Sequence, residues 1–302
     1  MQLIARKTPP GRLINVDGRR THIVLKGTGT PTVVLEGGIG TISTMWNPIL
    51  DAVAEFTTVC TFDRPGYAWS DATDAPRTSR QMASELGALL EAAKLPGPYV
   101  LVGHSIGGLN AKLFAAMYPK RVAGLVLLDA VDESVFEISA HFRSSMIAIA
   151  RLFTMLGTIA HAGVLPVLTR LLGTRAAPPY VAKLSTHDRA EVLAQYSAKT
   201  FATSRAEAVA LVEHKRELPH AEHFGDLPVA IIARDEIVSR NERGRQAERA
   251  WRAAQIAQQS LSTRSSFVVP GQCGHDVPVD APGLVVHNIR AMLTSLPRNA
   301  AR

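Results

Sequence analysis

Residues 99–118, YVLVGHSIGGLNAKLFAAMY, decide the fold of this chain. Their first four residues form a continuous apolar run, which is typical of a strand buried on both faces of a parallel sheet. Their last ten residues are typical of a helix. Between the two lies Gly103-His104-Ser105-Ile106-Gly107, in which a glycine stands on each side of the serine at a spacing of two. The segment therefore predicts a buried strand, a sharp turn with Ser105 at its apex, and a helix.

Such a turn suits a nucleophilic side chain. Small residues are needed two positions before and after the nucleophile, because larger side chains would collide with the neighbouring strand and helix. Gly103 and Gly107 meet this need. The helix that begins at the turn directs backbone N–H groups and the positive end of its dipole toward developing negative charge. We expect Ser105 to be exposed at the carboxyl end of the sheet and the Ile106 N–H to donate to an oxyanion.

Short β-branched and aliphatic runs recur along the chain, and each is followed by a stretch that is typical of a helix. This alternation predicts an α/β fold with a mostly parallel, twisted sheet and helices on both of its faces. We expect about eight strands in this sheet. Seven strands can be placed, at 22–25, 32–35, 58–62, 99–102, 124–128, 229–233 and 266–269.

The region 132–224 has no convincing strand pattern. Apolar residues at 142, 146, 149, 153 and 156 follow helical spacing, and a Pro pair at 178–179 separates them from a second helical part at 188–217. We predict a core formed by residues 1–131 and 225–302, with a helical cap inserted at 132–224. The stretch 152–169 reaches roughly the minimum length of a membrane span. Its Thr, Gly, His and Pro residues predict two short helices with a break instead.

Composition narrows the possible partners. The chain has 302 residues, 46% hydrophobic and 20% charged, as in globular proteins with a large core. The net charge is +7, but the 33 Lys and Arg residues are spread without a basic and aromatic pattern, so we expect no nucleic-acid partner. Cap arginines such as Arg143, Arg151 and Arg170 would allow peripheral contact with anionic lipid. No pattern indicates an oligomeric state.

The cysteine content and the N-terminus favour a cytoplasmic protein. Cys60 and Cys273 are too few for a disulfide scaffold, which favours a reducing compartment. The first residues, MQLIARKTPPGR, do not match a signal peptide. Histidines at 214, 220 and 223 cluster, but no convergent set of ligands accompanies them. We therefore expect neither a metal nor a cofactor.

With these motifs in place, the sequence resembles the α/β-hydrolase superfamily over nearly the whole chain apart from the cap. Residues 33–40, VVLEGGIG, are similar to the oxyanion loop of the family, although many members have His-Gly where this chain has Glu36-Gly37. The resemblance implies that the Gly38 N–H is the second oxyanion donor. His104, Ile39 and Trp46 are expected to line the substrate site.

A second segment carries the resemblance further. Residues 62–71, FDRPGYAWSD, resemble the turn Asp-Arg-x-Gly-x-Gly-x-Ser of the superfamily, with Ala68 in place of the second glycine. We interpret Asp63 and Arg64 as structural, because an Asp–Arg pair at a strand end commonly orients backbone and loops.

The general base and its acid follow later strands. VVPGQCGH places His275 in a loop after the last strand, as in the family. Asp235 lies between Ser105 and His275 in the family's order of nucleophile, acid and base, and we expect it to hold the imidazole. The preceding segment is one residue shorter than in the family, which leaves Glu236 as a rival acid. Asp129 and Asp132 follow an earlier strand and are further candidates.

The resemblance implies a serine hydrolase that acts on a carboxylic ester, thioester, lactone or amide of a small, apolar acyl substrate. A serine nucleophile argues against the epoxide hydrolases and dehalogenases of the superfamily, which use a carboxylate. Acyl transfer, carbon–carbon bond hydrolysis and hydroxynitrile cleavage would use the same Ser/His pair, and a non-catalytic receptor for a small molecule is a further alternative.

Overall fold

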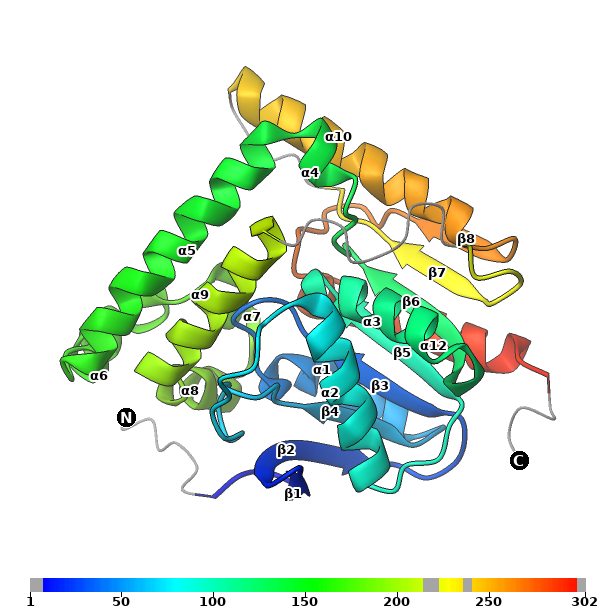
Figure 1. Cartoon of the computed structure of the whole chain (residues 1–302), viewed down its shortest axis with the longest axis horizontal. Helices are drawn as coiled ribbons and strands as arrows, with labels where there is room; N and C mark the ends of the chain where they lie inside the picture. The colour runs from blue at the N-terminus through cyan, green and yellow to red at the C-terminus, as the bar shows by residue number, and fades with distance from the viewer. Residues whose placement is uncertain (1–7, 214–222, 236–240, 298–302) are drawn as a thin grey trace.

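A mostly parallel sheet forms the centre of the computed structural model, which describes residues 8–213, 223–235 and 241–297. Within these residues the sheet has eight strands in the order β1-β2-β4-β3-β5-β6-β7-β8. The first two pairings, β1–β2 and β2–β4, are antiparallel, and all the others are parallel. Figure 1 shows helices on both sides of this sheet. The predicted fold class is thus confirmed.

The strands are β1 (Arg12–Val16), β2 (Arg19–Lys26), β3 (Thr32–Glu36), β4 (Val59–Phe62), β5 (Tyr99–His104), β6 (Val122–Leu128), β7 (Val229–Ile232) and β8 (Ser265–Val268). Seven of them lie where the sequence pattern predicts strands. β1 was not predicted, because it is short, lies at the edge of the sheet and buries little of its side chains.

Two apolar layers hold helices against the faces of the sheet. One layer joins the sheet to α2 (Ser79–Ala92), α3 (Ile106–Met117) and α10 (Glu242–Ala257). The other joins it to α1 (Asn47–Ala54), α11 (Val277–Asp280) and α12 (Pro282–Ser295). Alternate residues of a central strand enter opposite layers, as Leu101 and Val102 of β5 do. The continuous apolar runs of the central strands follow from this double burial.

In the described part of the chain, six α-helices, called the inserted helices below, lie between β6 and β7: α4 (Val135–Ile138), α5 (Ala140–His161), α6 (Leu165–Leu172), α7 (Pro179–Lys183), α8 (Thr186–Ala194) and α9 (Ala198–Glu213). Short 3-10 helices are η1 (Ser43–Trp46), η2 (Pro119–Arg121), η3 (Gly173–Ala176) and η4 (Gln258–Leu261). Among the described residues of this insertion there is no strand.

The predicted break in the insertion occurs, but the helix before it is long. α5 continues for 22 residues to His161, and α6 begins at Leu165 after a turn with Gly163 at φ +72°. Figure 1 shows α5 along the outer side of α9. The rings of Phe153 and Phe201 stack between the two helices, with centroids 6.3 Å apart. α5 is also long and apolar enough to cross a membrane by length and composition, the one such helix among the described residues.

Candidate active site

The turn after β5 is sharp, as the sequence predicts, and its backbone is strained at Ser105. Ser105 has φ 56° and ψ −122°, a left-handed conformation that is rare for residues other than glycine. A Cβ atom on Gly103 would lie 2.4 Å from the Gly107 carbonyl oxygen, and one on Gly107 would lie 2.3 Å from the Glu36 oxygen. Both positions therefore require glycine, and the backbone presents Ser105 between a buried strand and a helix.

A third glycine of this turn was not singled out by sequence reasoning. A Cβ on Gly108 would lie 2.3 Å from the Cβ of Ala130, on the loop after β6. The two loops are also joined by hydrogen bonds, since the Ser105 N–H donates to the Leu128 oxygen (3.1 Å) and the Val131 N–H to the Ser105 oxygen (2.9 Å). The loop after β6 is therefore packed directly against the nucleophile turn.

His275 connects this turn to a buried acid. Its Nε2 lies 3.2 Å from the Ser105 Oγ, and its Nδ1 lies 2.6 Å from the Oδ2 of Asp129. The other oxygen of Asp129 accepts hydrogen bonds from the Trp251 Nε1 (2.8 Å) and from the Arg234 N–H (3.2 Å). Burial acts to raise the pKa of Asp129, but the hydrogen bond and charge of His275, together with Arg234 and Trp251, outweigh it, so the pKa is lowered. Asp129 is consequently a buried carboxylate.

The prediction that Asp235 holds His275 is wrong in this structure. Asp235 is exposed, and its carboxylate pairs with the Arg252 guanidinium at 3.3 Å. The reason is the order of strands: Asp129 follows β6, which lies beside β5, whereas Asp235 follows β7, one strand farther from the serine. Asp132 is also excluded, because it pairs with the Lys112 Nζ at 3.0 Å. Glu236 lies outside the described residues.

The predicted oxyanion loop lies against the serine. A Cβ on Gly38 would be 3.2 Å from the Cβ of Ser105. The guanidinium of Arg64 donates to the oxygens of Gly37 (2.6 Å) and Gly38 (2.9 Å). In a trans peptide the carbonyl and the following N–H point in opposite directions, so these bonds turn the Gly38 N–H away from Arg64. Ile106 is the first residue of α3, and its N–H therefore has no acceptor within the helix.

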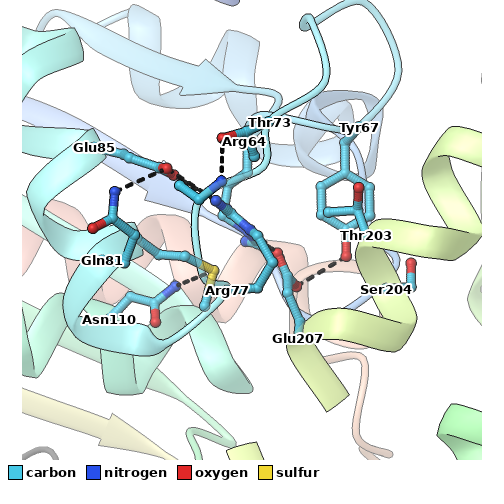
Figure 2. Close-up of polar contacts among 12 residues, drawn as sticks. Arg64, Tyr67, Thr73, Arg77, Gln81, Glu85, Asn110, Thr203, Ser204 and Glu207 are labelled. Carbon is cyan, nitrogen blue, oxygen red and sulfur yellow. Dashed lines mark hydrogen bonds and ion pairs between the residues drawn. The ribbon is translucent and has the colours of Figure 1, made fainter. Parts of the chain in front are cut away.

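A buried network of charges fixes Arg64 (Figure 2). Its Nε and Nη2 donate to the two oxygens of Glu207 at 2.9 and 2.8 Å, and the Tyr67 hydroxyl donates to the same carboxylate at 2.9 Å. Arg77 pairs with Glu85 at 2.8 Å and approaches Glu207 at 3.8 Å. Since Glu207 belongs to α9, the network ties an inserted helix to the oxyanion loop. The structural role predicted for Arg64 agrees with this geometry; the network through Glu207 was not predicted, because no local pattern marks it.

Glu36 adds a buried acid beneath the same loop. Its Oε1 accepts a hydrogen bond from the Asn110 Nδ2 at 2.5 Å and lies 4.0 Å from Arg64. Burial raises the pKa of Glu36 to about 7, although Arg64 and Asn110 act in the opposite direction. Glu36 therefore changes charge near neutral pH.

Asp63, which precedes Arg64 in the segment 62–71, has a structural role of its own. Its Oδ2 lies 2.7 Å from the His22 Nδ1, and its Oδ1 accepts the Ser43 N–H at 2.7 Å. All three residues are buried. Asp63 thus joins β2, the loop after β4 and the start of η1.

A cavity of about 860 Å³ opens onto the site. The inserted helices contribute apolar side chains to its wall, among them Phe142, Met146, Phe153, Leu156, Phe201 and Leu211. Ser105, His275 and Gly38 are also part of its lining. Ile39 and His104 also line it, as expected.

His104 is buried, and its Nε2–H donates to the His275 carbonyl oxygen at 2.9 Å. Burial lowers the pKa of His104 to about 3, so the ring is neutral. The expectation for Trp46 is wrong: its ring is 1% exposed and packs with α1 and α12 in the core, not in the wall of the cavity.

Trp251 is a site residue that sequence reasoning missed. Besides its bond to Asp129, its ring lies edge-on to the ring of His275, with centroids 5.9 Å apart, and the guanidinium carbon of Arg234 lies over the Trp251 ring, 5.2 Å from its centroid. A tryptophan on a helix gives no signal of such a role in the sequence.

The histidine cluster provides no metal site in the described part of the chain. There, no group of three or more His, Cys, Asp and Glu side chains could hold a metal ion. His223 accepts the Gly225 N–H at its Nδ1, at 2.9 Å. Residues 214 and 220 lie outside the described residues. Cys60 and Cys273 are buried free thiols.

A model of the alpha/beta hydrolase fold family matches residues 31–282. The chain belongs to the α/β-hydrolase family. Among curated proteins it is similar to the uncharacterized protein YqjL of Bacillus subtilis, with 36% identity over 115 residues, which are 38% of this chain and 46% of YqjL. This α/β-hydrolase chain also spans less than half the length of other curated relatives that it matches.

Solved structures show the same fold with different chemistries. A thermophilic esterase from Thermogutta terrifontis superposes with a TM-score of 0.65 and 20% identity, covering 99% of this chain and 100% of the esterase. An epoxide hydrolase from Bacillus megaterium gives a TM-score of 0.69 and 16% identity, covering 94% of this α/β-hydrolase chain and 100% of the other. The likeness establishes the fold, and the reaction has to be argued from the site.

Proposed function

We propose that this α/β hydrolase is a serine hydrolase that cleaves an ester-type bond of a small apolar substrate through an acyl-enzyme. One observation carries the proposal: the Ser105 Oγ, the His275 ring and the Asp129 carboxylate form a continuous chain with contacts of 3.2 and 2.6 Å. A hydroxyl aligned with an imidazole whose other nitrogen faces a buried carboxylate is the arrangement that activates a serine.

In the proposed cycle, His275 removes the Ser105 proton while the oxygen attacks an acyl carbonyl. The N–H groups of Gly38 and Ile106 donate to the resulting oxyanion. His275, now charged and facing Asp129, gives the proton to the leaving group, which departs. A water molecule, deprotonated by His275, then attacks the acyl-enzyme and releases the acid and Ser105.

The cavity supports an apolar acyl group as the part of the substrate that is bound. Aromatic and aliphatic side chains of the inserted helices line it, and burial of an apolar group there is favourable by about 25 cal/mol per Å². The residue at the turn is a serine and not an aspartate, which supports acyl chemistry over epoxide opening. The epoxide reaction forms an alkyl-enzyme on a carboxylate, and serine does not provide a carboxylate.

A fluorophosphonate probe tests the nucleophile directly. We expect the wild type to be labelled and the Ser105→Ala variant to remain unlabelled. Ser145→Ala is the matched control, because Ser145 lines the same cavity but its hydroxyl donates to the His141 oxygen of its own helix. A wild-type protein that is folded but not labelled would favour a small-molecule receptor.

A panel of p-nitrophenyl esters of increasing acyl length then defines the substrate class. We expect hydrolysis by the wild type and a loss on the order of 10⁶-fold in Ser105→Ala. Product analysis with an added alcohol separates hydrolysis from acyl transfer, because transfer would convert the acyl group into a new ester. Hydrolysis that persists in Ser105→Ala would contradict the proposed mechanism.

A further inference from the structure

Exposed apolar side chains gather on one side of the inserted helices. Nine large hydrophobic side chains are exposed among the described residues, and seven of these fall within residues 147–172. They are Ile147, Leu152, Met155, Val164, Val167, Leu171 and Leu172, with exposures from 42% to 75%. We call these seven residues the α5–α6 face. A concentration of this kind on a soluble fold marks an interaction surface.

The α5–α6 face is the outer side of helices whose inner side is turned into the molecule. On α5, Ile147 and Met155 are eight residues apart and lie on one side of the helix, with Arg151 between them. On α6, residues 167 and 171 are four apart and also share one side. The inner side of α5 packs on α9 and lines the cavity. Only 6% of the most apolar 18-residue stretch of α5 is nevertheless buried inside the structure. Figure 1 shows α5 and α6 at the margin of the molecule, with no helix over their outer side.

The ionised side chains of the segment that carries this face, those of Lys and Arg, have a single sign of charge. No Asp or Glu occurs from residue 138 to residue 187, whereas the same segment holds Arg143, Arg151, Arg170, Arg175 and Lys183. Arg151 and Arg175 are exposed. Lys183 is paired with Asp280. A second copy of the chain would bring like charges together, but an anionic surface would complement them.

We propose that the α5–α6 face docks on an anionic lipid bilayer, with its apolar side chains in the interface and Arg151 and Arg175 at the level of the phosphates. A helix that is apolar on one side and basic beside it lies in the plane of the interface and does not cross the bilayer. Leu152 is 46% exposed and also lines the cavity, so the docked apolar surface is continuous with the proposed acyl pocket. An apolar substrate dissolved in the bilayer would thereby reach Ser105 without crossing water.

Co-sedimentation with vesicles tests this docking without any measurement of activity. We expect the full chain to bind phosphatidylcholine–phosphatidylglycerol vesicles, to bind pure phosphatidylcholine vesicles much more weakly, and to be released as salt is raised. Leu172→Asp should lose most of this binding. Ile256→Asp is the matched control, because Leu172 and Ile256 are both 48% exposed and Ile256 lies on α10, outside the face.

A second pair of variants tests the contribution of arginine charge to vesicle binding. Arg151→Ala should weaken binding to the anionic vesicles about fivefold, since one basic residue near such a surface contributes about 1 kcal/mol. Arg12→Ala removes an exposed arginine of β1 and should leave binding unchanged. Ser105→Ala should bind like the wild type, so a failure of the proposed reaction and a failure of docking are distinguishable.

Three results would overturn the proposal. The first is a folded wild type that stays in the supernatant with excess anionic vesicles. The second is a Leu172→Asp variant that binds as well as the wild type. The third is a wild type that is dimeric by sedimentation velocity, becomes monomeric in Leu172→Asp and binds no vesicles; a second copy of the chain would then cover the face.

Discussion

Replacing Asp129 by asparagine should abolish most catalysis while leaving the fold intact. The structure dictates how the new amide is oriented. Its oxygen must stay where the Trp251 and Arg234 N–H groups donate, at 2.8 and 3.2 Å, because an NH₂ group there would face two donors. The NH₂ group then faces the His275 Nδ1, which sits 2.6 Å from the present carboxylate.

The consequence is a histidine in the wrong tautomer. With an NH₂ donor in front of it, the Nδ1 of His275 must be an acceptor, so the proton moves to Nε2. A protonated Nε2 donates to the Ser105 Oγ and cannot take its proton. The corresponding change in a serine protease lowers kcat about 10⁴-fold, and the same loss here is about 5.5 kcal/mol of transition-state stabilisation.

The assay is kcat for the best p-nitrophenyl ester of the panel, with circular dichroism and thermal melting to verify the fold. Asp235→Asn is the control, because Asp235 is exposed and its carboxylate pairs with Arg252, away from His275. We expect this control to stay within about twofold of the wild type, as surface ion pairs have little effect. A folded Asp129→Asn enzyme within tenfold of the wild type, or an equal loss in Asp235→Asn, would refute the assignment of the acid.

Three stability measurements test the packing and charges around the site. Gly108→Ala should destabilise the fold by about 1–3 kcal/mol in urea, because its Cβ would lie 2.3 Å from that of Ala130; an unchanged midpoint would contradict this contact. Glu207→Gln leaves the buried Arg64 without its bidentate partner and should cost about 3–5 kcal/mol, so a loss below 1 kcal/mol would count against the network. The pKa of Glu36 is raised from 4.5 to about 7, so the folded state binds more protons than the unfolded state between these values, and wild-type stability should fall as pH rises through them. Glu36→Gln lacks this titration and should gain up to about 3 kcal/mol relative to the wild type between pH 4 and pH 8; a difference that does not change with pH would refute it.

Sequence reasoning succeeded where the deciding contacts lie close together along the chain. Gly103, Ser105 and Gly107 share one turn, and the need for glycine there follows from atoms within a few residues and from the neighbouring β3 loop. His275 was found because its position after the last strand is set by chain order. The sheet followed from the alternation of apolar runs and helices, which is a local property of each segment.

The acid and the cavity wall depended on contacts between distant segments. Asp129 and Asp235 both follow a strand of the parallel sheet, so their local sequences do not distinguish them; only the placement of β6 beside β5 brings Asp129 to His275. Trp46 belongs to the core because η1 packs with α1 under the sheet. Local sequence thus determined the turn, its serine and the fold class. Tertiary structure decided which acid faces His275, how Glu207 of α9 holds Arg64 against the predicted oxyanion loop, and which side of α5 is exposed. The reason is that strand order and helix packing decide which distant side chains meet.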